Sequence, residues 1–309
     1  MTHQVLFKRD LVSIRDLTRQ DVDSIFALAD RFKKKAVTVD LQGAIIASCF
    51  FEPSTRTRLS FEAAALRLNA HIIGFANEES LSIRKGETLS DTIRMIASYA
   101  DLIVLRHKLE GAALLAAELA DCPVINAGDG ANQHPTQALI DFFTIKECQQ
   151  KLDGLAIGLV GDLKYGRTIH SLLQLCKLFD VRLYMIAPDS LTLPDVLCDD
   201  LKKSGVRFSF HYSLSDVMSK LDILYATRIQ AERFTDPTDD VVKNDLIITP
   251  LLLTQAKDNL KVLHPLPRVN EIDTQCDALP YAYYFQQASN ALPVRQALLS
   301  LILNESPLL

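Results

Sequence analysis

Short apolar segments alternate with longer amphipathic segments along nearly the whole chain, and this alternation constrains the fold more than any other feature. Apolar runs of about four to eight residues are typical of buried strands, whereas apolar residues that recur every three or four positions are typical of helices. Strands that alternate with helices pair in parallel, in a sheet that the helices cover on both faces. The predicted strands span 44–51, 71–75, 102–106 and 123–126 in a first series and 155–161, 182–187, 223–227 and 261–264 in a second.

The two series of strands predict two domains. A chain of 309 residues is long enough for two domains that each bury a core. We therefore expect an α/β protein with two open parallel sheets, each covered by helices on both faces. The pattern leaves open against which domain the last helix packs. The predicted helices span 21–28, 56–68, 88–99, 110–120 and 135–149, then 167–179 and 214–220, and finally 294–303, after Pro293.

The strand at 44–51 leads into the sequence STRTR at 54–58, where a helix begins. A helix start has N–H groups without intrahelical acceptors and a partial positive charge, so it attracts anions. Arg56 and Arg58 oppose this dipole unless an anion binds, and arginine can bind phosphate through two parallel hydrogen bonds. The alternative is a serine-capped helix with solvated arginines. Neither GxxxxGK[ST] nor GxGxxG occurs, which favours a small phosphorylated substrate over a nucleotide.

Five of the predicted strands have a polar or charged residue at or shortly after their carboxyl end. Ligands of open parallel sheets bind beyond these ends. Five such positions, spread over both series, predict a single cleft between the two domains. The positions are Arg56, Arg106, Asp162, Arg228 and His264.

The composition excludes several classes of protein. The formal net charge of -5 disfavours nucleic acid as a partner, because phosphate backbones bind basic surfaces. The six cysteines lack paired spacing and matching histidines, so neither a metal site nor disulfides are expected. The chain has no signal-peptide core and no apolar run of roughly 18 to 20 residues, so we expect a cytoplasmic protein without a membrane segment.

Seven short motifs occur in one order along nearly the whole chain. Together they resemble the catalytic chains of the aspartate carbamoyltransferase family, within the aspartate/ornithine carbamoyltransferase superfamily. The resemblance is nearest to the bacterial type that associates with separate regulatory chains. The motifs are STRTR at 54–58, KGE at 85–87, RH at 106–107, NQHPTQ at 132–137, DLKYGRT at 162–168, TRIQ at 227–230 and HPLPR at 264–268.

This resemblance implies the transfer of a carbamoyl group from carbamoyl phosphate to L-aspartate, the committed step of pyrimidine (UMP) biosynthesis. It implies a carbamoyl phosphate-binding domain of residues 1–135, joined by a C-terminal helix within 288–309, and an aspartate-binding domain of residues 150–287. It also implies a homotrimer whose active sites lie in clefts between domains and between subunits. Regulatory chains would complete a larger assembly, and no metal or organic cofactor is implied.

The resemblance also assigns residues to carbamoyl phosphate. Amine attack on the carbonyl carbon forms an oxyanion and phosphate leaves with added charge, so fixed positive groups and hydrogen-bond donors are needed there. Ser54, Thr55, Arg56 and Thr57 are implied to hold the phosphate. Arg106, His134 and Thr57 are implied to reach the carbonyl oxygen. Gln137 and the backbone carbonyls of Leu266 and Pro267, joined by a cis peptide, are implied to orient the carbamoyl NH2.

A second group of residues is implied to bind L-aspartate. The two carboxylates of this substrate suit bidentate guanidinium groups, which Arg167 and Arg228 provide, with Gln230 near the second. Glu52, just before the phosphate-binding segment, is a candidate ion-pair partner for Arg167 or Arg233 when the domains close.

Lys85 is implied to come from a neighbouring subunit and to bridge both substrates. Relatives commonly carry a serine four residues before this lysine, where this chain has Leu81, so we expect Ser80 or Ser82 to contact the phosphate. The implied catalytic residues are therefore Arg56, Thr57, Lys85, Arg106 and His134.

Three other functions are compatible with parts of the sequence. Ornithine carbamoyltransferase shares the phosphate-binding segment, but its amino-acid site resembles His-Cys-Leu-Pro, whereas this chain has HPLPR at 264–268. A non-catalytic homologue usually loses the phosphate arginine, the loop lysine or the histidine, and this chain keeps all three. A dinucleotide-binding dehydrogenase would account for the turn at 161–162, but the chain lacks the glycine motif that such a site requires.

Overall fold

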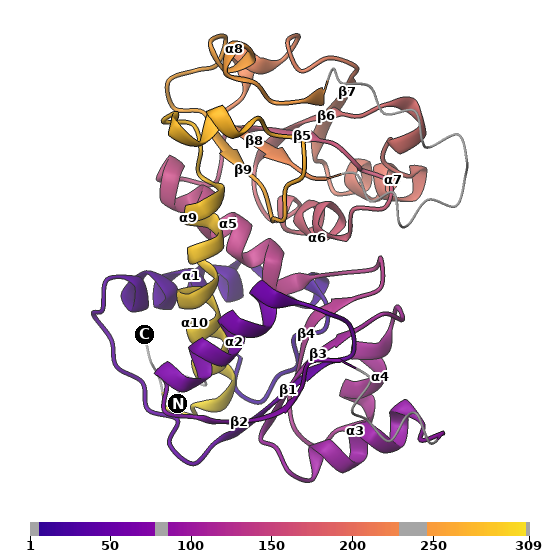
Figure 1. Ribbon diagram of the computed structural model, residues 1–309, viewed down its shortest axis with the longest axis vertical. Coiled ribbons are helices and arrows are strands. Elements are labelled where there is room, and N and C mark those ends of the chain that lie inside the picture. The colour runs from indigo at the N-terminus through magenta and orange to yellow at the C-terminus, as the bar shows by residue number, and fades with distance from the viewer. Residues whose placement is uncertain (1–5, 78–85, 229–245, 307–309) are drawn as a thin grey trace. The chain divides into compact units, whose positions relative to one another are not determined.

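The computed structural model describes residues 6–77, 86–228 and 246–306. The chain divides into two compact units, each with its own parallel sheet (Figure 1). The first unit comprises Met1–Leu139 and Asn290–Leu309, and the second comprises Ile140–Ser289. The prediction of an α/β protein with two parallel sheets is therefore confirmed.

The first unit is built on a four-stranded sheet in the order β2-β1-β3-β4. Its inner strands, β1 (Ile45–Phe50) and β3 (Leu102–His107), are buried along nearly their whole length, as expected for strands covered on both faces. The outer strands are β2 (His71–Phe75) and β4 (Val124–Asp129). Because β1 and β3 pair in parallel, the ends of both strands lie side by side.

Helices cover both faces of this sheet (Figure 1). On one face, α3 (Leu89–Ala97) and α4 (Ala112–Leu119) pack against β3, and α4 also packs against β4. On the other face, α2 (Thr55–Arg67) packs against β1 and β2. The C-terminal helix α10 (Ala291–Leu303) packs against α2 and against α1 (Arg19–Lys33), so the end of the chain belongs to the first unit.

The second unit is built on a five-stranded parallel sheet in the order β7-β6-β5-β8-β9. Its central strand, β5, carries an apolar sequence that is buried on both faces. The strands are β5 (Leu155–Val160), β6 (Val181–Ile186), β7 (Arg207–His211), β8 (Ile223–Ala226) and β9 (Lys261–Leu263).

Helices of the second unit follow its strands in turn. They include α6 (Arg167–Cys176), α7 (Asp195–Lys203), the short α8 (Pro250–Leu253) and α9 (Tyr284–Ser289). Helix α5 (Pro135–Gln149) begins in the first unit and ends in the second, because the division between the units follows Leu139.

The structure differs from the sequence predictions at several elements. The predicted helix at 214–220 is wrong, since only a 3-10 turn at Met218–Lys220 forms there. The sequence did not predict β7 or α7: β7 is an edge strand with few buried residues, and α7 buries only Cys198 and Leu201. Helix α10 begins two residues before Pro293, whose missing N–H is tolerated in a first turn.

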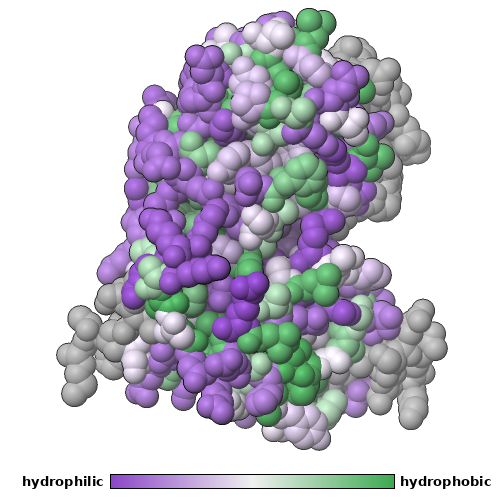
Figure 2. All heavy atoms as spheres, turned by 60° about the vertical axis from the view of Figure 1, so that its left-hand side comes forward, coloured by the Kyte–Doolittle hydropathy of each residue, from purple (hydrophilic) through white to green (hydrophobic). Residues whose placement is uncertain are grey.

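On the face drawn in Figure 2, hydrophilic side chains predominate and apolar areas are interspersed among them. Within the described ranges, no helix is both long and apolar enough to span a membrane.

Gly161 at the end of β5 offers a test of the second sheet. Its φ is +117°, and a Cβ there would overlap the backbone carbonyl of Thr227 at the end of β8. We expect Gly161→Ala to lower the free energy of unfolding by about 2 to 4 kcal/mol, from overlap and strain together. Gly154→Ala is the matched control, because Gly154 also has a positive φ but a Cβ there would make only an ordinary contact, at 3.9 Å, with Lys151 Nζ. Its expected cost is about 1 kcal/mol. Equal urea midpoints for the two variants would contradict the close approach of the β5 and β8 ends.

Candidate active site

The first turn of α2 lacks an internal acceptor for its N–H groups. Ser54 is the N-cap, in an extended conformation with φ of -156° and ψ of 105°, but its side chain makes no capping hydrogen bond. The first turn carries no acidic residue either. These N–H groups and the positive end of the helix dipole therefore suit an anion from outside the helix.

The two arginines of this turn differ in what they contact. The Nε of Arg58 pairs with Glu62 Oε1 at 3.2 Å, one turn later in α2, and Glu62 also accepts from the Ser48 hydroxyl at 3.0 Å. The side chain of Arg56 is exposed, and its partial burial lowers its pKa. Among the described residues, no carboxylate forms an ion pair with it. Of the two arginines, the predicted phosphate ligand Arg56 is thus the one that remains available to an anion.

Thr57 and His134 come together although they lie on different elements. Thr57 belongs to the first turn of α2, and His134 directly precedes α5. Thr57 Oγ1 lies 3.4 Å from His134 Nε2, and the two residues are only 7% and 4% exposed. Gln137 lies in the first turn of α5. The starts of α2 and α5, which carry most of the predicted carbamoyl phosphate residues, are therefore neighbours.

The loop before His134 is fixed by Asp129, a residue that no motif of the sequence had singled out. Asp129 is 2% exposed, and its carboxylate accepts from the side chains of Asn126 and Asn132, both at 2.9 Å. It also accepts from the backbone N–H groups of Gly111 and Gln133. Asparagine, glycine and aspartate clustered after a strand are a signal for such a turn.

Arg106 lies near the end of β3, opposite Phe50 of β1. Its Nη2 pairs with Glu52 Oε1 at 2.7 Å, and its Nη1 donates to the carbonyl oxygen of Ala127 at 3.4 Å. Glu52 therefore holds the Arg106 guanidinium. Because β1 and β3 are adjacent, this cation lies close to the segment that leads into α2. The pairing of Glu52 with Arg167 or Arg233 on domain closure stays a prediction.

In the second unit, the predicted aspartate ligand Arg167 is buried at the start of α6. The turn before α6 is shaped by Asp162, whose Oδ1 accepts from the backbone N–H groups of Lys164 and Tyr165. This aspartate turn explains the Gly161–Asp162 pair without a dinucleotide. Arg228 follows β8 directly after the buried Thr227.

The segment Leu266–Pro267 contains the cis peptide that the resemblance implied. His264 fixes the approach to it: the backbone N–H of Leu266 donates to His264 Nδ1 at 2.8 Å, and His264 Nε2 lies 2.7 Å from Glu271 Oε1. Since Nδ1 accepts a hydrogen bond, the neutral ring carries its proton on Nε2 and donates it to Glu271. Burial alone would raise the pKa of Glu271, but hydrogen bonds from His264 and backbone N–H groups lower it to about 2.

The same segment is tied to the core of the second unit. Gln287 Oε1 accepts from the backbone N–H of His264 at 2.7 Å, while Gln287 Nε2 donates to Asp141 Oδ1 at 2.7 Å. Tyr225 also donates to Asp141, at 2.8 Å. The sequence did not reveal this network of hydrogen bonds, because the residues that form it are far apart along the chain.

Four of the residues expected at the site lie outside the described residues. They are Ser80, Ser82, Lys85 and Gln230. Arg233, one of the two expected partners of Glu52, lies outside them too.

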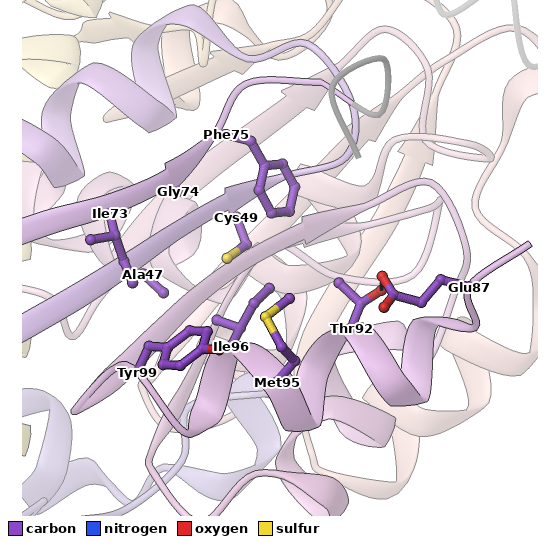
Figure 3. A pocket seen from close by; sticks show the side chains of 10 residues that line it. All are labelled: Ala47, Cys49, Ile73, Gly74, Phe75, Glu87, Thr92, Met95, Ile96 and Tyr99. Atoms are coloured by element: carbon purple, nitrogen blue, oxygen red, sulfur yellow. Dashed lines mark hydrogen bonds between the residues drawn. The ribbon is translucent and has the colours of Figure 1, made fainter. Parts of the chain in front are cut away.

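The first unit contains a cavity of about 290 Å³, drawn in Figure 3. It is mostly apolar, and Thr92 donates to Glu87 at its polar end. None of the predicted site residues that the structure describes lines it. In the part of the chain that the structure describes, no cluster of side chains could hold a metal ion.

Two family models match the chain. The model described as aspartate/ornithine carbamoyltransferase, carbamoyl-P binding domain, matches residues 9–147. The model described as aspartate/ornithine carbamoyltransferase, Asp/Orn binding domain, matches residues 153–302.

Individual proteins match over nearly the full length. The aspartate carbamoyltransferase catalytic subunit of Vibrio campbellii is 51% identical over 304 residues, which cover 97% of this chain and 98% of the relative. The crystal structure of Trypanosoma cruzi aspartate transcarbamoylase with N-(phosphonacetyl)-L-aspartic acid has a TM-score of 0.91 and 39% identity over 97% of both chains. The same enzyme with carbamoyl phosphate and aspartate has a TM-score of 0.90, 39% identity, and coverage of 97% and 98%.

Arg56 offers a test of the anion site. We expect Arg56→Ala to leave the thermal midpoint of the ligand-free chain unchanged or to raise it, because this cation opposes the helix dipole by about 0.3 to 1 kcal/mol. Inorganic phosphate is expected to stabilise the wild type more than this variant. Arg58→Ala is the control, since it removes the pair with Glu62 and not the proposed anion ligand. The anion site would be excluded if ligand-free Arg56→Ala had a clearly lower thermal midpoint than the wild type and if phosphate still raised the midpoint of this variant as much as that of the wild type.

Proposed function

The chain belongs to the aspartate/ornithine carbamoyltransferase family, and we infer that it transfers the carbamoyl group of carbamoyl phosphate to L-aspartate. The products are N-carbamoyl-L-aspartate and phosphate, so the chain carries out the committed step of pyrimidine biosynthesis. The observation that supports this most strongly is the meeting of Thr57 and His134 beside an uncapped helix start, with Arg106 at the end of a neighbouring strand.

For the phosphate, we propose Ser54, Thr55, Arg56 and Thr57 as ligands. Support comes from the α2 start, which offers N–H groups, hydroxyls and a guanidinium without a carboxylate nearby. As the bond to the carbonyl carbon breaks, charge grows on the bridging oxygen. A fixed cation such as Arg56 stabilises this charge without reorganisation during the reaction.

For the carbonyl oxygen, we propose that Arg106, His134 and Thr57 donate hydrogen bonds. Glu52 holds the Arg106 guanidinium, and Thr57 contacts the buried His134, so each donor is fixed before substrate binds. A neutral His134 acts as a donor and not as a base in this mechanism, because the leaving phosphate can accept the amine proton.

For the carbamoyl NH2, we propose the side chain of Gln137 and the backbone carbonyls of Leu266 and Pro267 as acceptors. The hydrogen bond from the Leu266 N–H to His264 holds the latter segment in place. Such fixed contacts reduce the entropy cost of aligning the carbonyl carbon with the attacking amine.

For L-aspartate, we propose Arg167, Arg228, Gln230 and Lys85 as ligands. Guanidinium groups bind carboxylates through two parallel hydrogen bonds. A site lined by cations favours an acidic amino acid over ornithine, whose second amino group would meet like charge. We propose that Ser80 or Ser82 adds a contact to the phosphate.

The assembly is also a proposal. We propose a catalytic homotrimer in which Lys85 reaches a neighbouring active site, and regulatory chains that bind this trimer. The support is the motif resemblance to the bacterial type. A cytoplasmic location is proposed because all six cysteines are free thiols, as is usual in a reducing compartment.

His134→Ala tests the proposed reaction. We expect the purified wild-type chain to carbamoylate L-aspartate and not ornithine, as measured by the colour reaction of the ureido product. His134→Ala is expected to lower kcat by about 10² to 10³-fold, as loss of one oxyanion donor does.

His211→Ala is the control, because His211 lies on the edge strand β7 and contacts Ser209. Its activity is expected to equal that of the wild type. Preferred carbamoylation of ornithine, or near-normal kcat in His134→Ala, would refute the assignment.

A further inference from the structure

Arg295 of α10 is a buried cation that the proposed reaction does not yet use. It is 1% exposed, and its guanidinium stacks on Phe61 of α2, with 4.4 Å between Cζ and the ring centroid. Its Nη1 donates to the hydroxyl of Ser60, and its Nη2 lies 3.5 Å from the hydroxyl of Thr136. Its Nε has no hydrogen-bond partner among the residues that the structure describes. Among residues 6–77, 86–228 and 246–306, no carboxylate forms an ion pair with it.

A buried arginine of this kind is unusual. Removing a charge from water is costly unless a counter-charge or a full set of hydrogen bonds replaces the water. Burial lowers the pKa of Arg295 to about 9, with repulsion from Arg106 as a second cause. The guanidinium therefore remains protonated at neutral pH, and a neutral hydrophobic side chain would cost the ligand-free fold less.

The position of Arg295 suggests what compensates for this cost. Ser60 lies one turn after Arg56 in α2, and its hydroxyl in turn donates to the carbonyl oxygen of Arg56. Thr136 lies in the first turn of α5, next to Pro135 and between His134 and Gln137. Arg295 thus contacts the second turn of α2, one turn after the proposed phosphate ligands, and the first turn of α5. Its charge is also close enough to Arg106 for the two to repel each other.

We propose that Arg295 is a positioning residue that completes the phosphate site, by bridging α2 and α5 and adding a buried positive charge for a phosphate dianion. This inference rests on the proposed function. When the dianion binds, its negative charge offsets the mutual repulsion of Arg295 and Arg106 and compensates the buried cation. The C-terminal helix thereby contributes to the affinity of the first unit for phosphate, without touching the substrate.

A purely structural role makes a different prediction. If Arg295 only links the helices, its loss would lower the stability of the ligand-free chain and leave phosphate affinity unchanged. If Arg295 serves the dianion, its loss would weaken phosphate binding and leave ligand-free stability unchanged or higher.

Arg295→Met in the full-length chain separates these cases, with inorganic phosphate as the probe in calorimetric titration. We expect the phosphate dissociation constant to rise by about tenfold or more, as loss of a buried charge interaction implies. The KM for carbamoyl phosphate is expected to rise, while the KM for aspartate at saturating carbamoyl phosphate stays the same. Arg295→Lys, which keeps the charge, is expected to recover part of the affinity.

Arg182→Met is the matched control. Arg182 of β6 also stacks on an aromatic ring, that of Tyr184, donates to a serine hydroxyl, that of Ser209, and has an Nε without a partner. It lies in the second unit, so its loss is expected to leave phosphate affinity unchanged.

Arg295→Gln, which keeps donors but removes the charge, decides the matter if Arg295→Met fails to fold. Phosphate affinity within about twofold of the wild type in either variant would overturn the inference. That result, in a wild-type chain that binds phosphate and forms carbamoyl aspartate, would leave the proposed function intact. Failure of the wild type itself to bind phosphate would instead refute the phosphate site and the proposed function together.

Discussion

The start of α2 is the constraint on which the rest of the first unit depends. Its N–H groups have no capping side chain, its first turn has no carboxylate, and Arg56 adds a further positive charge. Such a helix start is unfavourable by itself and favourable when an anion binds. The sheet serves this site, because the parallel pairing of β1 and β3 brings Arg106 beside the segment that enters α2.

Carboxylates support the site from outside it. Glu52 holds Arg106, Glu62 pairs with Arg58, and Asp129 fixes the loop that ends at His134. In the second unit, Glu271 orients His264, and the ring of His264 holds the Leu266 backbone. Each carboxylate is bonded to protein groups, and none of them pairs with Arg56, so the proposed phosphate ligands at the α2 start keep an excess of positive charge. The carboxylates thus position other protein groups, whereas cations and N–H groups are the proposed substrate ligands, and this division suits a reaction of two anionic substrates.

The sequence predicted the two parallel sheets, because these follow from local patterns. A shared role for Thr57 and His134 was implied only by the motif resemblance, and the two side chains lie 3.4 Å apart. The sequence did not predict that Arg58 would pair with Glu62, although their spacing of four residues on one helix is a known signal for such a pair. Arg295, Asp129 and Asp141 were missed for another reason. Their roles depend on partners that only folding brings close to them, and no local sequence pattern indicates those partners.

The most direct test is a crystal structure of the chain with carbamoyl phosphate bound. The phosphate group should lie at the first turn of α2, within hydrogen-bond distance of the backbone N–H groups of residues 55–57 and of the Arg56 guanidinium. The carbonyl oxygen should face Arg106 and His134. A phosphate bound elsewhere, with the α2 start contacting only solvent, would contradict the anion site from which the mechanism was derived.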